Sequence, residues 1–152
     1  IDRLRKEFPE TVVGLKDSSG DWSNMKAILE RFPGFELFPG AELFLLDGLR
    51  GGAAGVISAT ANVSGKMMRE LFDDWKGEGA DAKQEAISAL RKAIQSYPMI
   101  PMLKALVAHF REDPGWAQMR PPFLPMTAEE AKAAVAAVVS AHKFSMDVSV
   151  EV

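Results

Sequence analysis

The sequence predicts an α/β fold in which three successive β/α units are followed by an all-helical region. Three short apolar runs each end at a cluster of turn-forming residues and lead into a segment with helical spacing of apolar residues. From Gly77 onward the strand-like runs cease, and helical stripes and proline-containing connectors follow. Successive β/α units indicate parallel strands joined by right-handed crossovers.

The first unit is centred on the stretch Thr11 to Gly20, TVVGLKDSSG. Its apolar residues predict a short buried strand that stops at the turn-forming cluster Asp17 to Gly20. Lys16 therefore lies at the carboxyl end of this strand. Burying an unpaired ammonium is costly and favours the neutral amine, which condenses with a ketone to form an imine. The simpler interpretation is that Lys16 extends its charged head into solvent.

An amphipathic helix is predicted over Trp22 to Phe32, where apolar residues recur at i, i+3, i+4 and i+7. Asp21 or Ser23 would cap its start, and Pro33-Gly34 would stop it. Ahead of the strand, Ile1 to Phe8 is charged and amphipathic and has the pattern of the tail of a helix. The chain is therefore expected to begin in the middle of a larger architecture.

The second unit has Phe35 to Phe38 as its strand and Leu43 to Leu49 as a short helix that is apolar on nearly all sides. The turn Pro39 to Glu42 joins them. In the third unit, Ala54 to Ala59 is the expected strand. The small polar stretch Thr60 to Asn62 then leads into a helix whose apolar stripe is Met68, Leu71, Phe72 and Trp75.

Three helices are expected in the region that follows. Ala82 to Tyr97 has apolar residues on one face, and a second helix opens at Pro98 to Pro101, where prolines suit a first turn. Thr127 and Glu130 predict a capping box for a last helix that ends near His142. The tail, Ser145 to Val152, alternates like an edge strand but receives no assignment, because it is short and terminal.

Composition excludes several classes of function. The 152 residues carry a net charge of -3 with no clustered basic face, so nucleic-acid binding is not expected. No cysteine is present, and His109 and His142 lack ligand spacing, so neither disulfides nor a metal site is expected. No apolar run approaches the ~20 residues of a membrane span, and no signal pattern opens the chain. We therefore expect no membrane association and a cytoplasmic location.

Parallel β/α units occur in doubly wound sheets and in (β/α)₈ barrels. A dinucleotide fold has no support, because no G-x-G-x-x-G follows the first strand. In a barrel, Lys16, the Pro39 to Glu42 turn and the segment Ser58 to Asn62 would converge at the carboxyl ends of the strands. A complete barrel takes about 250 residues, so three units are too few to close one.

The ordered motifs GLKDSSG (14–20), FPGAE (38–42) and GGAAGVISATANV (51–63) resemble the last three barrel strands of the dihydrodipicolinate synthase and N-acetylneuraminate lyase family. The segments 98–104 and 120–127 resemble its C-terminal helical domain. This resemblance implies the C-terminal part of a (β/α)₈ TIM barrel over residues 1–79, a helical domain over 80–144 and a tail over 145–152. It also implies an N-terminal half-barrel segment before Ile1.

By this resemblance, Lys16 is the Schiff-base lysine that binds pyruvate or another small-molecule 2-oxo acid substrate, without a cofactor or metal. Gly40 and Ile57 match positions whose backbone lies against the substrate, and Ser58 is a further candidate for substrate binding. Glu42 and Ala59 are candidates for reading the substrate's distal end, although Glu42 is equally expected as a helix N-terminal acid. The family's proton-relaying tyrosine would precede Ile1, and Tyr97 does not match it. A homo-oligomer, tetrameric in the family, is expected.

Several substrates and classes stay open. Sialic acid lyases have two adjacent acids after the second turn's glycine, whereas Leu43 follows Glu42, so that substrate is disfavoured. Residues 97–104 depart from the Asn-Pro-Ile-Pro-Val-Lys run of lysine-biosynthesis synthases. KDSSG is closer to aldolases or dehydratases of 2-keto-3-deoxy sugar acids. Two alternatives from other classes are a non-catalytic fragment and a cofactor-binding barrel with an anion near residues 58–62.

Overall fold

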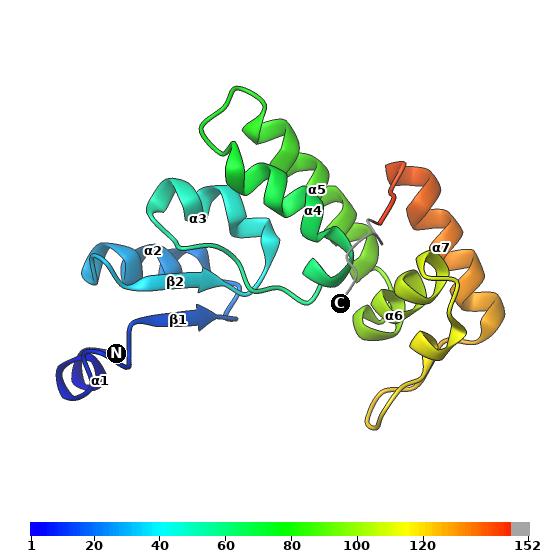
Figure 1. The fold of residues 1–152 in the computed structure, drawn as a ribbon, viewed down its shortest axis with the longest axis horizontal. Helices are drawn as coiled ribbons and strands as arrows, with labels where there is room; N and C mark the ends of the chain where they lie inside the picture. The colour runs from blue at the N-terminus through cyan, green and yellow to red at the C-terminus, as the bar shows by residue number, and fades with distance from the viewer. Residues whose placement is uncertain (147–152) are drawn as a thin grey trace.

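The computed structural model describes residues 1–146, and a two-stranded parallel sheet lies in its N-terminal part. Strand β1, Gly14–Asp17, pairs with β2, Glu36–Pro39, in the register Lys16 with Phe38 and Asp17 with Pro39. The two arrows in Figure 1 point the same way, so the carboxyl ends of both strands lie at one edge of the sheet. Helix α1, Asp2–Glu7, precedes β1.

The first β/α unit is confirmed, but the description of its strand was wrong in two respects. The strand begins at Gly14 instead of Val12, and Val13 is 51% exposed. Lys16 is also exposed. The cause is that β1 pairs with β2 alone within residues 1–146, so one of its edges and part of one face have no covering element.

Helix α2, Trp22–Arg31, follows β1 as the apolar spacing predicts. Asp21 is its N-cap, with a carboxylate oxygen accepting from the amides of Ser23 at 2.9 Å and Asn24 at 3.4 Å. Met25 is fully buried on its inner face. Gly20 ahead of the cap has a φ of +72°, a backbone conformation that suits glycine.

The second unit runs from β2 through a 3₁₀ turn, η1, Glu42–Phe44, into α3, Leu45–Gly51. The predicted buried helix is confirmed, since its leucines Leu45, Leu46 and Leu49 are all buried. Gly52 ends α3 in a left-handed conformation with a φ of +93°, which is typical of a glycine C-cap.

The expected third strand, Ala54 to Ala59, is not a strand in the structure. The amide of Ala54 donates to the carbonyl of Leu37 at 2.9 Å, which would begin a parallel pairing of Ala54 with Phe38. The second hydrogen bond of this pairing would run from the amide of residue 39 to the carbonyl of Ala54, but Pro39 has no N–H. Ile57, one residue later than a regular register requires, donates to the carbonyl of Pro39 at 3.1 Å. The segment therefore runs beside β2 without forming a ladder.

Helices make up most of the remaining chain. The α-helices are α4, Ala61–Asp73; α5, Ala80–Gln95; α6, Met99–Phe110; and α7, Ala128–His142, with the 3₁₀ turn η2, Pro114–Ala117, between α6 and α7. The capping box of Thr127 and Glu130 is confirmed at the start of α7. Within the described tail, Ser145 and Met146 have no regular secondary structure, and the rest of the predicted alternation lies outside the described residues.

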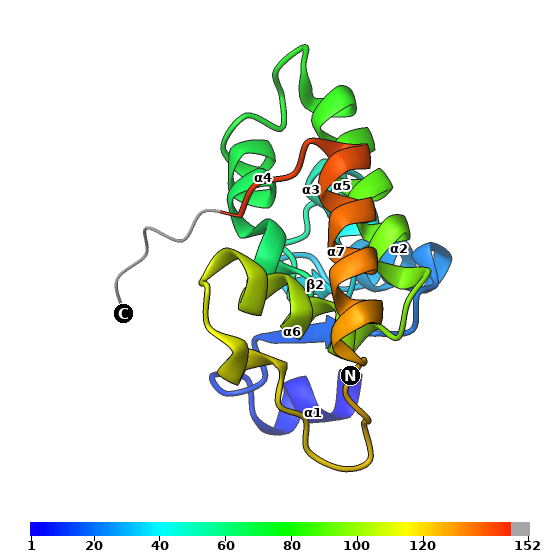
Figure 2. The same cartoon turned by 90° about the vertical axis from the view of Figure 1, so that its right-hand side faces the viewer.

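Two apolar clusters hold these helices together, and α5 belongs to both. One cluster joins leucines of α3 to Met68, Leu71 and Ile87. The other joins Leu90 and Ile94 of α5 to α6 and α7. Figures 1 and 2 show α4 and α5 side by side between the sheet with α3 and the α6–α7 pair. Among residues 1–146, no helix is long and apolar enough to cross a membrane.

Candidate functional site

The carboxyl edge of the sheet brings three separate segments together. The amide of Gly40, just after β2, donates to the carbonyl of Asp17 at 2.6 Å. The amide of Ile57 donates to the carbonyl of Pro39 at 3.1 Å. The last residue of β1, the turn after β2 and the segment leading to α4 are therefore joined through their backbones at this edge.

Lys16 lies on the face of the sheet that α2 does not cover. Side chains alternate along a strand, and Asp17 faces α2, because its carboxylate accepts from the Asn24 side chain at 2.7 Å. Lys16 and its register partner Phe38 therefore face the opposite side. Within residues 1–146, Lys16 makes no hydrogen bond or ion pair, so its amine is available to a ligand.

Asp17 fixes the turn that follows Lys16. Its second carboxylate oxygen accepts from the Ser19 amide at 2.7 Å, which forms a side-chain-closed turn, and the Asn24 bond ties this turn to α2. Burial alone would raise the pKa of Asp17, but the hydrogen bonds from Ser19 and Asn24 together outweigh it and lower the pKa. A negative carboxylate therefore lies next to Lys16 in sequence, but on the other face of the sheet.

Gly40 is required by close packing against the turn after β1. A Cβ atom there would lie 2.8 Å from the carbonyl oxygen of Asp17 and 2.9 Å from the Cα of Ser18. Both atoms belong to the backbone, so they cannot yield as a flexible side chain would. Ile57, by contrast, is 46% exposed at the carboxyl edge, although its amide is bound to the carbonyl of Pro39.

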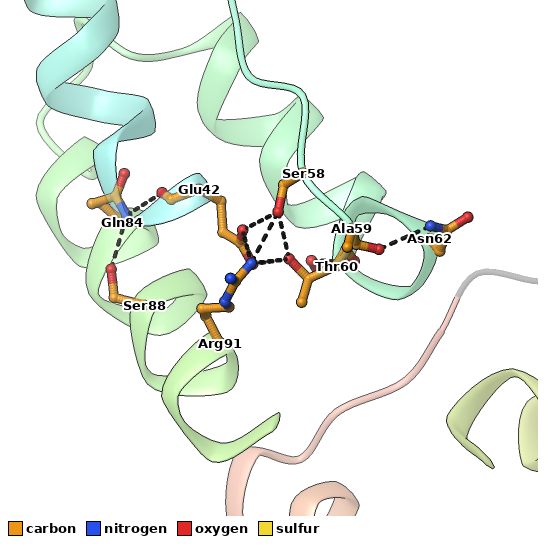
Figure 3. A network of polar contacts seen from close by, with 9 residues as sticks. Glu42, Ser58, Ala59, Thr60, Asn62, Gln84, Ser88 and Arg91 are labelled. Carbon is orange, nitrogen blue, oxygen red and sulfur yellow. Dashed lines mark hydrogen bonds and ion pairs between the residues drawn. The ribbon is translucent and has the colours of Figure 1, made fainter. Parts of the chain in front are cut away.

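Glu42 and Ser58 meet inside the protein in a polar cluster that also contains Thr60 and Arg91. One carboxylate oxygen of Glu42 accepts from the Ser58 hydroxyl at 2.5 Å and from Nη1 of Arg91 at 3.0 Å. Its other oxygen accepts from the Thr60 hydroxyl. Figure 3 shows these four side chains pointing at one another from η1, from the segment before α4 and from α5. The polar atoms of Glu42 and Ser58 are thus engaged within the protein.

The cluster is almost entirely out of solvent. The side chains of Glu42 and Arg91 are 1% and 8% exposed, and Thr60 is fully buried. The opposite charges of Glu42 and Arg91 compensate each other, as buried charges require. Gln84 of α5 adds a second tie, because its amide group donates to the carbonyl of Glu42 at 3.0 Å and accepts from the Leu46 amide at 2.9 Å.

Sequence reasoning missed Arg91 and the role of Thr60. One signal for Arg91 was present, since Ile87, Arg91 and Ile94 lie at i, i+4 and i+7 on the buried face of α5. A charged residue on an apolar stripe indicates a buried partner of opposite charge. Its partner Glu42 is 49 residues away in sequence, and only the fold brings the two together.

Comparison with known proteins decides the family. The sequence model of the Dihydrodipicolinate synthetase family matches residues 1–142, which is nearly the whole chain. The chain belongs to the dihydrodipicolinate synthetase family. The resemblance drawn from GLKDSSG, FPGAE and GGAAGVISATANV is therefore confirmed.

Individual members of the dihydrodipicolinate synthetase family show how much of such a protein the chain represents. A DapA-like lyase of uncharacterised activity from Chloroflexus aurantiacus is 36% identical over 138 residues, which cover 90% of this chain and 46% of the relative. The crystal structure of dihydrodipicolinate synthase from Agrobacterium tumefaciens superposes with a TM-score of 0.78 at 29% identity, covering 92% of this chain and 46% of that one. The chain thus spans about half the length of these relatives.

A more distant member shares the fold alone. N-acetylneuraminate lyase from Fusobacterium nucleatum, solved in complex with pyruvate, has a TM-score of 0.76 at 20% identity, with 93% of this chain and 49% of that chain covered. The helices and the small parallel sheet of residues 1–146 are therefore the arrangement found in half of a family member.

Proposed function

We propose that this chain forms the lysine-bearing half of a Schiff-base lyase or synthase, of the class I aldolase type, that acts on pyruvate or a related 2-oxo acid. The observation that carries the proposal is the position of Lys16. Its amine is unpaired within residues 1–146, at the carboxyl edge where the Gly40 turn and Ile57 also lie. Membership of a family of lyases and synthases supports the reaction class.

The chemistry follows from a primary amine beside a ketone. The neutral amine of Lys16 attacks the carbonyl carbon of the 2-oxo acid, and the carbonyl oxygen leaves as water with the two amine protons. Protonation of the resulting imine makes it an electron sink, so that a carbon–carbon bond at the adjacent carbon can form or break. The fold-level relative that holds pyruvate favours pyruvate as the first compound to test.

In this proposal, Gly40 and Ile57 present backbone atoms to the substrate. Gly40 allows the turn after β2 to pack closely against the turn after β1, and Ile57 is exposed at the same edge. Glu42 and Ser58 belong to the same two segments: Glu42 lies two residues after Gly40, and Ser58 directly follows Ile57. Because their polar atoms already bind Arg91 and Thr60, we assign them to support of the turns; contact with a substrate hydroxyl would require the cluster to open.

The face of the β1–β2 sheet opposite α2 is uncovered within residues 1–146, which favours a barrel completed by further β/α units. In a (β/α)₈ barrel, the face away from the helices is the packed interior, and that is the face of Lys16 and Phe38. We propose that five preceding β/α units of the same protein cover this face and supply the proton-relaying tyrosine and the carboxylate-binding loop. The family resemblance adds a homo-oligomer, tetrameric in form, and a cytoplasmic location to the proposal.

A second candidate within the family is an aldolase or dehydratase of 2-keto-3-deoxy sugar acids, which the KDSSG motif favours. It shares the imine on Lys16 and differs in what the distal end of the site accepts. A non-catalytic role and a cofactor-binding barrel are the alternatives from other classes, and both predict no imine on Lys16.

Trapping of the imine tests the proposal. Borohydride reduces an imine to a stable amine, so the full-length protein treated with pyruvate and borohydride should gain one adduct, which peptide mapping places on Lys16. Repeating the treatment with longer hydroxylated 2-oxo acids then separates the two substrate classes. Adducts scattered over other lysines, with Lys16 unmodified, would overturn the proposal and leave only the shared fold.

A further inference from the structure

The buried cluster around Glu42 connects the two turns of the proposed site to the helical region. Glu42 follows Gly40 by two residues, and Ser58 follows Ile57 directly. Arg91, on α5, donates to both Glu42 and Ser58 at 3.0 Å. One guanidinium nitrogen on a helix therefore holds a residue from each of the two turns that border the carboxyl edge of the sheet.

The polar atoms of Glu42, Ser58 and Thr60 in this cluster all have partners. The hydroxyls of Ser58 and Thr60 donate to the two carboxylate oxygens of Glu42. Nη1 of Arg91 lies within hydrogen-bonding distance of one of those oxygens and of both hydroxyl oxygens. These shared contacts fix the relative positions of the four side chains, because moving one of them leaves a buried donor or acceptor without a partner.

Stability alone is a weak explanation for the arginine. An apolar side chain of similar volume often stabilises a buried position as well as an ion pair does. Arg91 also leaves its Nε atom buried without a partner among the described residues, which costs free energy. Placing Ser58 and Glu42 in a fixed arrangement is a role that an apolar residue could not perform.

We infer that Arg91 is a positioning residue, and that its ion pair with Glu42 holds the Gly40–Glu42 turn and the Ile57–Thr60 segment in the arrangement that receives the 2-oxo acid. The inference rests on the proposed function for the place of the substrate. Glu42 then acts through the backbone of its turn and does not read substrate hydroxyls.

Variants at the pair give this inference a direct test in the full-length protein. Arg91→Met should lower the second-order rate constant for imine trapping with pyruvate and borohydride about 100-fold, because misplaced substrate contacts can cost that much. Arg91→Lys keeps the positive charge, so this rate constant should fall less. Glu42→Gln should lower the same rate constant as well, although pyruvate has no hydroxyl group for Glu42 to bind. A loss confined to hydroxylated 2-oxo acids in Glu42→Gln, with Arg91→Met unaffected, would overturn the inference.

The chain offers a matched control. Arg50 of α3 binds Asp81 of α5 through two hydrogen bonds of 2.9 and 2.8 Å, but these side chains are 46% and 75% exposed and lie outside the cluster. Arg50→Met should leave the rate constant for imine trapping with pyruvate unchanged. An equal loss in Arg50→Met and Arg91→Met would assign the effect to general loosening of α5 and overturn the positioning role.

Two further measurements keep the test decisive. If Arg91→Met does not fold, the double variant Glu42→Gln/Arg91→Met, which removes both charges together, is measured in its place. A wild-type rate constant for imine trapping in that folded double variant would refute the inference. Hydrogen exchange at the Ile57 and Gly40 amides needs no substrate. These amides should lose protection in Arg91→Met and keep it in Arg50→Met, even if the wild-type protein forms no adduct with pyruvate. Unchanged protection in Arg91→Met would overturn the positioning role of the Arg91–Glu42 ion pair.

Discussion

The amide of Gly40 and the carbonyl of Asp17 are joined by a hydrogen bond of 2.6 Å, one residue beyond Lys16. This bond extends the β1–β2 pairing one residue past the end of β2. Because Asp17 is itself bound to Ser19 and Asn24, the bond also connects the Gly40 turn to the start of α2. The backbone beside Lys16 is therefore fixed on two sides, although the lysine side chain is free to move.

Gly40→Ala should destabilise the protein and disturb the site together. A methyl group at this position would lie 2.8 Å from the Asp17 carbonyl oxygen, and forcing it in should cost about 1–3 kcal/mol of unfolding free energy, as overpacking does. Urea denaturation measures the loss. Gly65→Ala is the control, because its added Cβ meets nothing within 4 Å and it lies inside α4, where alanine should stabilise by about 0.5–1 kcal/mol. Equal effects of the two substitutions would contradict the packing argument.

Asp17→Asn should cost more stability near neutral pH than in acid. The pKa of Asp17 in the folded protein lies below its ordinary value of 3.8, so the unfolded chain binds the proton more readily. The stabilisation from the ionised carboxylate is therefore complete above 3.8 and is lost as the pH falls through the folded-state pKa. Unfolding free energies of both proteins, measured near neutral pH and below 3.8, should converge in acid. Glu10→Gln, at an exposed carboxylate, controls for the change in net charge.

Helices were predictable from this sequence because their signals are local. Apolar spacing predicts 22–32 where the structure has Trp22–Arg31, and the capping box of Thr127 and Glu130 marks the start of α7 without knowledge of the fold. Strand limits depend on neighbours. The segment after Ala54 contains an apolar run, yet it forms no ladder because Pro39, on a different segment, cannot donate to it.

In the candidate site, too, residues with a local signal could be predicted, whereas contacts between distant segments could not. Lys16 could be singled out because a lysine at the end of an apolar run is unusual, and family motifs added Gly40 and Ile57. The apolar stripe of α5 could have marked Arg91 as a buried charge, but its partner Glu42 could not be predicted, because the two lie 49 residues apart in sequence. The domain boundary between residues 79 and 80 stays a prediction. The two apolar clusters do not separate at this boundary, because α5 contributes residues to both.

Loss of Arg91 should be far more damaging to stability than loss of an exposed arginine. Arg91→Met leaves the Glu42 carboxylate buried without a counter-charge, which costs about 3–5 kcal/mol in comparable cases. The double variant Glu42→Gln/Arg91→Met should recover part of this loss, because no unpaired charge remains. Chemical denaturation of the four proteins in the cycle gives the coupling free energy. A coupling near zero would show that the two side chains do not depend on each other.

Lys16→Arg should abolish imine formation while leaving the protein folded. A guanidinium stays protonated and cannot condense with a ketone, whereas its length and positive charge allow its head to reach the carboxyl edge of the sheet, near which Lys16 lies on β1. The full-length variant should therefore keep its circular dichroism spectrum and unfolding midpoint, but form no adduct with pyruvate and borohydride and show no turnover. Lys26→Arg is the matched control, since Lys26 lies exposed on α2 beside Glu30 and should keep full activity. Wild-type turnover in Lys16→Arg would remove the Schiff base from the mechanism, because no atom of the substituted side chain could form it.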